Sequence, residues 1–129
     1  MKQLEPGMMP FTRLMGVEVT SQEKDRIVGR ISVREDLCTT GRIMHGGAVM
    51  AMADALAAIG AYLNIPEGAK ATTTIESKTN FMRAAPLNSI VTGECTPLHV
   101  GRRTSVWQTT LRNEEHKTIA VVTQTQMVL

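Results

Sequence analysis

Apolar and polar residues alternate in two segments near the start of the chain and in four segments towards its end. Residues Gly16–Thr20 alternate weakly and Arg26–Arg34 more regularly, which predicts two strands around the polar turn Ser21–Asp25. The four later segments are rich in Thr, Val and Ile, which favour strands. These segments are Thr72–Arg83, Ser89–Leu98, Thr104–Arg112 and Thr118–Val128. The polar connections between them predict hairpins.

One segment between the two sets of strands has a helical composition. Residues Gly46–Leu63 are mostly Ala, Met and Leu, which have high helix propensity. The helix is predicted to end before Pro66 and Gly68. The loop Glu35–Met44 precedes it, and residues 1–14 are expected to form an irregular or short helical lead-in.

The order of these elements predicts a single α+β domain over residues 1–129. One helix cannot cover both faces of a sheet of five to six strands. The simplest arrangement is therefore an antiparallel sheet curled around the helix, with its other face available to a partner subunit.

Asp54 is the only charged residue in the predicted helix. At 100° per residue, the large apolar side chains gather on the opposite face and are expected to pack into the sheet. They are Val49, Met52, Leu56, Ile59 and Leu63. The residues around Asp54 are nearly all small: Gly47, Met50, Ala51, Ala57, Ala58 and Ala61. A semi-buried carboxylate beside a narrow slot is expected there.

Two other interpretations of this helix have to be weighed. Its length reaches the threshold for a membrane span, but a central Asp54 and three glycines favour a buried core helix. The Asp54 carboxylate can also have a structural role, reaching water or accepting hydrogen bonds from a neighbour. A catalytic role gives a reason to keep a charge in such surroundings.

The sequence His45-Gly46-Gly47 begins the helix. The first helical N–H groups have no intrahelical acceptor, and the helix dipole favours negative charge at this end. Two residues without side chains leave room for a substrate carbonyl, so the segment is a candidate oxyanion hole. The alternative is that His45 is only a turn residue.

Composition narrows the function classes. A net charge of +2 and 3% aromatic residues do not favour nucleic-acid binding, and neither a P-loop nor GxGxxG occurs. Cys38 and Cys95 lie far apart, which predicts two inert thiols in a cytosolic protein. The N-terminal segment contains Glu5, Pro6 and Pro10 and does not resemble a secretory signal, so a cytoplasmic location and no membrane association are expected.

The segment Met44–Ala48 followed by Met52–Asp54 resembles the hotdog-fold acyl-CoA thioesterases, specifically the PaaI-like branch of phenylacetate degradation. In that pattern an acidic residue stands nine positions after the histidine, as Asp54 does after His45. Other segments resemble the family in the same order along nearly the whole chain. They are Pro10-Phe11, Leu14–Val17, Asp36–Cys38, Asn80–Arg83 and His99–Thr104.

The resemblance implies roles for individual residues. Asp54 would be the nucleophile or the general base that activates water, and the Gly46 N–H would polarise the thioester carbonyl. His45 would help to shape that site, and Thr74 matches a position that often carries Ser or Thr near the acid. The family's active site lies between two subunits, which implies a homo-oligomer, a dimer or the homotetramer common in this branch. No metal or cofactor is implied, because CoA is part of the substrate.

Thr39 departs from the family pattern. Six positions before the histidine this branch usually has Asn or Gln, whereas here a shorter hydroxyl would have to position water or substrate. Thr39 therefore keeps open a second hypothesis, a non-catalytic acyl-CoA binding or regulatory protein. Dehydration of hydroxyacyl thioesters is disfavoured because the histidine motif of those enzymes is not evident.

Basic residues fit recognition of CoA. Arg102 and Arg103 follow a predicted turn and Arg83 ends a predicted strand, and guanidinium groups bind phosphates well. With Gly47 at the helix start they are the candidate substrate-binding residues, although solvated charged turns would look the same. The neighbourhood of Asp54, with Met50 and Met82, admits aromatic and aliphatic acyl chains.

Overall fold

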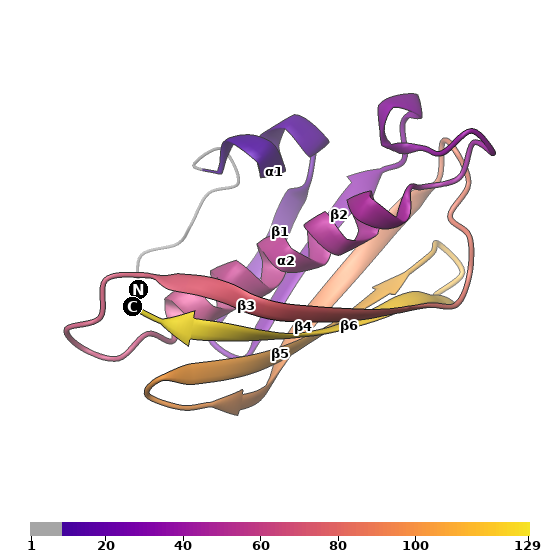
Figure 1. Cartoon of the computed structure of the whole chain (residues 1–129). Helices are drawn as coiled ribbons and strands as arrows, with labels where there is room; N and C mark the ends of the chain where they lie inside the picture. Colours follow the sequence, from indigo (N-terminus) through magenta and orange to yellow (C-terminus); the bar gives the residue numbers. More distant parts are fainter. Residues whose placement is uncertain (1–8) are drawn as a thin grey trace.

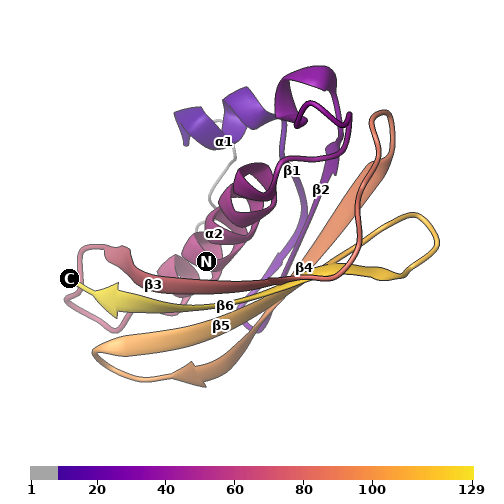
Figure 2. The same ribbon diagram turned by 45° about the vertical axis from the view of Figure 1, so that its right-hand side comes forward.

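The computed structural model describes residues 9–129 and contains a six-stranded sheet that curves around one long helix (Figures 1 and 2). Every strand pair is antiparallel, and the strand order is β1-β2-β4-β5-β6-β3. The strands are β1 Glu18–Glu23, β2 Arg26–Ser32, β3 Thr72–Phe81, β4 Ile90–Val100, β5 Thr104–Arg112 and β6 Thr118–Val128. The predicted α+β fold, an antiparallel sheet around one helix, is confirmed.

The long helix α2, Gly46–Leu63, lies on the concave face of the sheet. The face predicted to be buried is buried, with Met52, Leu56 and Ile59 fully inaccessible to solvent. By length and composition alone the helix is apolar enough to span a membrane, with a mean hydropathy of 1.5. Ten of its 18 residues are nevertheless buried by the rest of the chain, so it forms the core of the domain.

Close approach between α2 and the sheet depends on glycine at two positions. A Cβ added at Gly60 would lie 2.7 Å from the ring of Trp107, which is fully buried beneath the helix. A Cβ added at Gly93 on β4 would lie 2.8 Å from the side chain of Leu56. The missing side chains let bulky residues of the partner element fill this space, as close packing of a protein interior requires.

Strand β3 follows α2 in the chain but lies at the edge of the sheet, where β6 is its single partner among the described strands. Its first residue, Thr72, is opposite Val128, and its last, Phe81, is opposite Ala120. The alternation pattern predicted strand β3 but not which strand it pairs with. Because one side of β3 is unpaired within residues 9–129, it can pair with a strand of another molecule.

The first hairpin differs from its predicted bounds. Strand β1 continues to Glu23, although the alternation ended the predicted strand at Thr20. A register shift between Val19 and Ser21 interrupts the alternation of the two faces, so the second half of the strand has the pattern of a turn. The same effect lengthens β4 to Val100, beyond a second register shift near Pro97.

The remaining differences are at segment ends. The lead-in forms the short helix α1, Pro10–Met15, and the part of the prediction on residues 1–8 lies outside the described residues. The predicted loop contains one turn of 3-10 helix, η2 Glu35–Leu37. Strand β2 ends at Ser32 and β3 ends at Phe81, each two residues before its predicted end.

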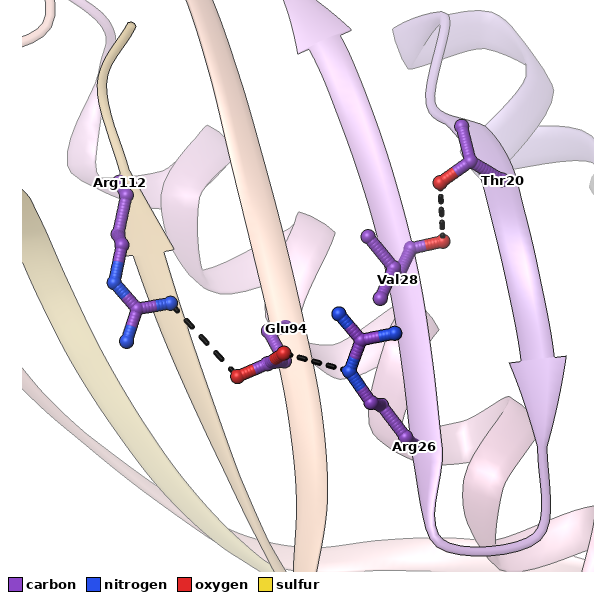
Figure 3. Close-up of polar contacts among 5 residues, drawn as sticks. All are labelled: Thr20, Arg26, Val28, Glu94 and Arg112. Atoms are coloured by element: carbon purple, nitrogen blue, oxygen red, sulfur yellow. Dashed lines mark hydrogen bonds and ion pairs between the residues drawn. The ribbon is translucent and has the colours of Figure 1, made fainter. Parts of the chain in front are cut away.

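The outer face of the sheet carries an ionic cluster (Figure 3). Glu94 lies between two arginines, with Arg26 Nε 2.7 Å from Oε2 and Arg112 Nη1 3.9 Å from Oε1. Thr20 on β1 donates its hydroxyl hydrogen bond to the Val28 carbonyl on the neighbouring strand. These contacts join four adjacent strands, β1, β2, β4 and β5, on the side of the sheet away from α2.

Candidate active site

The carboxylate of Asp54 is held from the sheet by neutral donors. The Thr74 hydroxyl donates to Oδ1 at 2.6 Å, and Gln124 Nε2 donates to the same oxygen at 3.0 Å. No Lys or Arg among residues 9–129 forms an ion pair with this carboxylate. The expected proximity of Thr74 to the acid is therefore present in the structure.

The prediction that Asp54 is semi-buried is wrong for the single chain, in which the residue is exposed. Its helical neighbours Ala57 and Ala61 are buried, but they are too small to cover a side chain that projects past them. Edge strand β3 covers one side of the carboxylate, and residues 9–129 supply no strand beyond that edge. The narrow slot expected beside Asp54 would need a second molecule to close it.

Two glutamines of β6 were missed by sequence reasoning. Gln124 contacts Asp54 directly, and Gln126 Nε2 donates to the Thr74 hydroxyl oxygen at 2.6 Å. Both side chains are 1% exposed, which is rare for glutamine. The available signal was the alternation in β6, where both glutamines continue the inward-facing series that begins with Ala120 and Val122.

At the helix start, His45 is the N-cap of α2. Its Nδ1 accepts a hydrogen bond from the Gly47 N–H at 2.8 Å, so that amide is already used. The Gly46 N–H, in contrast, donates to no acceptor among the described residues. A Cβ added at Gly46 would lie 3.1 Å from the ring of Phe81, so glycine is needed for this ring to approach. The unpaired amide has the chemistry expected of an oxyanion donor.

A hollow of about 410 Å³ lies beside this amide and brings together Thr39, Gly46 and Arg83. Its wall is otherwise apolar, with Phe81 and Met82 both more than half exposed. The hydroxyl oxygen of Thr39 accepts a hydrogen bond from the Gly41 N–H at 3.3 Å, so it stabilises its own turn. That contact leaves the hydroxyl proton of Thr39 available to a molecule in the hollow.

A second hollow, of about 440 Å³, lies on the other side of the helix start. Helix α1 forms its wall with two exposed side chains, Phe11 and Leu14, and His45 and Gly47 line its floor. Its lining is mostly apolar and continues to Cys38. The two hollows flank His45–Gly47 and offer apolar surface next to the candidate oxyanion donor.

Asp54 and Gly46 of one chain do not meet at one carbonyl group. Eight residues separate them, which is about 12 Å along the helix axis at 1.5 Å per residue. Attack on a carbonyl requires the nucleophile at about 3–3.5 Å and the oxyanion donor within hydrogen-bond distance of the same group. The single chain therefore holds two separated parts of the predicted machinery.

The predicted CoA-binding arginines divide between the two ends of the sheet. Arg83 lines the hollow with Gly46, whereas the turn containing Arg102 and Arg103 is held by a hydrogen bond from the Val128 N–H. The end of β3 beside Gly46 pairs with Ala120 of β6, which is eight residues before Val128 on the same strand. At about 3.3 Å per residue these ends are about 26 Å apart, so within one chain Arg102 and Arg103 do not serve the same position as Arg83.

Both cysteines are free thiols, and neither lies beside Asp54. Burial raises the pKa of the Cys95 thiol to about 12, partly offset by a hydrogen bond with Thr109, which disfavours the reactive thiolate. Cys38 is half-buried, and its thiol donates to the Arg34 carbonyl. The raised pKa agrees, for Cys95, with the prediction that the cysteines are inert.

Comparison with known proteins decides the family. The family model described as the thioesterase superfamily matches residues 41–120, more than half of the chain. The chain belongs to the thioesterase superfamily. A 1,4-dihydroxy-2-naphthoyl-CoA thioesterase of Arabidopsis thaliana is 30% identical over 99 residues, which cover 77% of this chain and 62% of that protein. The match thus spans less than two thirds of that relative.

Solved structures of thioesterases share the fold. A thioesterase of Haemophilus influenzae has a TM-score of 0.83 at 27% identity, covering 89% of this chain and 79% of that one. The PaaI protein of Escherichia coli, from the phenylacetic acid degradation operon, has a TM-score of 0.83 at 19% identity, with coverage of 93% and 84%. The hotdog fold and the membership of the thioesterase family expected from the sequence are confirmed, and the PaaI-like branch is consistent with both.

Proposed function

We propose that this thioesterase-superfamily protein hydrolyses an acyl-CoA thioester to the free acid and CoA, with Asp54 as nucleophile or general base. The observation that carries the proposal is the state of this carboxylate. Neutral donors bind Oδ1, no cation pairs with the group among the described residues, and no hydrogen bond within that part of the chain occupies Oδ2. A fixed but unneutralised carboxylate with one free oxygen suits attack on a carbonyl or removal of a proton from water.

The Gly46 N–H would bind the oxygen of the thioester carbonyl. As the carbonyl carbon becomes tetrahedral, negative charge develops on this oxygen, and an amide at a helix N-terminus stabilises it. The carbon–sulfur bond then breaks and CoA leaves. In the general-base route water supplies the new hydroxyl directly. In the nucleophilic route Asp54 first forms an anhydride with the acyl group, which water then hydrolyses.

The active site would be shared by two copies of the chain joined through β3. Antiparallel pairing of this strand with its own copy, centred on its middle, sets the start of one strand beside the end of the other. Thr74, which holds Asp54, would then lie opposite the partner's Thr79, two residues from the partner's Phe81. Since Phe81 covers Gly46, the pairing would bring Asp54 towards the other chain's oxyanion donor. Such pairing would overcome the separation of about 12 Å between Asp54 and Gly46 of one chain.

The hollows beside the helix start would receive the acyl group and part of CoA. Apolar walls and a volume of about 410 Å³ next to Gly46 fit an aromatic or aliphatic acyl chain, and Arg83 at the rim is placed for a phosphate. The naphthoyl-CoA activity named for the Arabidopsis relative makes an aromatic acyl-CoA one arm of the test.

The test is release of CoA thiol from aryl-, short-chain and long-chain acyl-CoA thioesters by the wild type and by Asp54→Ala. Turnover of at least one class is expected, together with loss of most of it in a variant that melts at the same temperature as the wild type. Full activity of Asp54→Ala on the best substrate would refute the assignment. Saturable CoA binding with no turnover across the panel would instead support the non-catalytic binding protein that Thr39 keeps open.

Subunit sharing has its own test, which mixes two inactive variants. Asp54→Asn lacks the carboxylate, and Gly46→Pro lacks the N–H but suits the first position of a helix. If the site is shared, unfolding and refolding the two together gives hybrid dimers with one intact site each. Random pairing then restores about one quarter of wild-type activity. Recovery of no activity in hybrids whose dimeric state is verified by sedimentation would place the whole site in one chain.

A further inference from the structure

We propose that Gln124 and Gln126, two buried residues of β6, are positioning residues that fix one oxygen of Asp54 and leave the other free to react. The inference rests on the proposed function of Asp54. It concerns positions after residue 120, where the match to the thioesterase superfamily ends.

The hydrogen bonds form a directed chain. A carboxylate only accepts, so the Gln124 amide must turn its nitrogen to Asp54 Oδ1, at 3.0 Å. Gln126 Nε2 donates to the Thr74 oxygen at 2.6 Å and occupies a lone pair of that hydroxyl. The single hydroxyl proton of Thr74 is then directed to Oδ1, also at 2.6 Å. Two donors from two strands therefore converge on one oxygen.

One atom of this hydrogen-bonded network has no partner among the described residues. Gln124 Oε1 is buried and has no hydrogen-bond partner among the described residues. A buried carbonyl without a partner destabilises the folded state, so a purely structural residue at this position would be better apolar. The Gln124 amide uses its nitrogen to bind Asp54 and leaves its oxygen without a partner. This fits a residue retained for its contact with Asp54, because local conflicts of this kind are expected at functional sites.

The sheet offers a matched control on its other face. Gln108 on β5 donates its Nε2 to the hydroxyl of Thr123 on β6 at 3.3 Å, so it also joins two strands through a Gln–Thr hydrogen bond. Unlike the β6 pair it is only half-buried, and its residue position faces away from α2 and Asp54. A variant at Gln108 thus reports what loss of such a contact does without reaching the carboxylate.

The experiment compares Gln124→Met, Gln126→Met and Gln108→Met in the whole protein, measuring kcat, KM and melting temperature with the best acyl-CoA substrate. Methionine keeps the length of the side chain and removes the amide. We expect kcat to fall about tenfold in Gln124→Met and less in Gln126→Met, with KM nearly unchanged and the melting temperature of Gln124→Met equal or higher. Gln108→Met should keep the wild-type kcat.

The opposite pattern would overturn the inference. A wild-type kcat in Gln124→Met, or an equal loss of kcat in Gln108→Met, would show that the buried amides do not act on Asp54. If Gln124→Met fails to fold, Gln124→Leu and Gln126→Met are measured instead, and a wild-type kcat in both has the same meaning. Failure of the proposed function has a different signature, since Asp54→Asn itself would then stay fully active, and this result would overturn both.

Discussion

Two carboxylates lie on opposite faces of the same sheet, and their surroundings differ in charge. Glu94 on the outer face has an arginine on each side, at 2.7 and 3.9 Å, and both of its oxygens are engaged (Figure 3). Asp54 on the inner side receives two neutral donors from the described residues, and both bind the same oxygen. Arginine contacts neutralise a carboxylate and occupy its lone pairs, whereas neutral donors orient it and leave its charge and one oxygen available.

The largest expected effect comes from paired isosteric changes at these two residues. Asp54→Asn should lower kcat by about 10²–10⁴-fold, because the amide neither attacks a carbonyl nor takes a proton from water. Glu94→Gln should change kcat by less than about twofold, since surface changes away from the site have small effects. Thiol-release kinetics on the same substrate measure both. Equal losses of kcat in the two variants would mean that the different surroundings of the two carboxylates do not matter for activity.

A second pair of variants separates the role of the Gly46 N–H as a hydrogen-bond donor from the role of the missing side chain. Gly46→Ala keeps the N–H and places a Cβ 3.1 Å from the Phe81 ring, while Gly46→Pro adds a similar bulk and removes the N–H. His45, with ψ of 137°, already has the extended conformation that a following proline requires. If the N–H binds the oxyanion, kcat of Gly46→Pro should be about 10²–10³-fold below that of Gly46→Ala. Similar values for the two would assign the role of Gly46 to shape alone.

A third pair compares two threonine–carboxylate contacts of equal length. Thr74 donates to Asp54 at 2.6 Å on the inner face, and Thr125 donates to Glu76 at 2.6 Å on the outer face. Thr74→Val should lower kcat about tenfold, because a hydrogen bond to a charged group is lost at the reacting carboxylate. Thr125→Val should leave kcat unchanged and lower stability slightly. Steady-state kinetics and thermal unfolding of both variants decide whether position, rather than bond type, sets the effect.

The sequence predicted the helix that carries Asp54 better than it predicted the hydrogen-bond partners of the Asp54 carboxylate. Asp54, the helix and its large apolar face followed from a 3.6-residue pattern within one segment, and all three are present. The partners of Asp54 come from β3 and β6, 20 and 70 residues further along the chain. Their proximity depends on β3 joining the sheet beside β6, a choice of neighbour that alternation within each strand does not encode.

Burial of Asp54 was mispredicted for a related reason. The small residues around it indicated room for something to approach, but not whether the same chain fills that room. In the structure β3 covers one side and then ends the sheet. Under the proposed pairing, the other side of Asp54 would be covered by a second molecule. Hydrophobic periodicity within one chain shows such a contact only as a face of small residues on the helix.

The smallest expected effect concerns the stability contributed by the outer cluster. Arg26 and Glu94 are 47% and 33% exposed, so water and salt screen their attraction, and such pairs contribute about 0.2–1 kcal/mol. Glu94→Gln should therefore lower the free energy of unfolding by no more than about 1 kcal/mol, and the difference should shrink in 1 M salt, where the Debye length is about 3 Å. Urea denaturation at low and high salt measures it, with Arg30→Gln, which removes the separate outer-face pair with Glu18, as the control. A loss several times larger that persists in high salt would mean that Glu94 acts as a buried structural group, and the contrast with Asp54 would then rest on burial instead of on the charge of the partners.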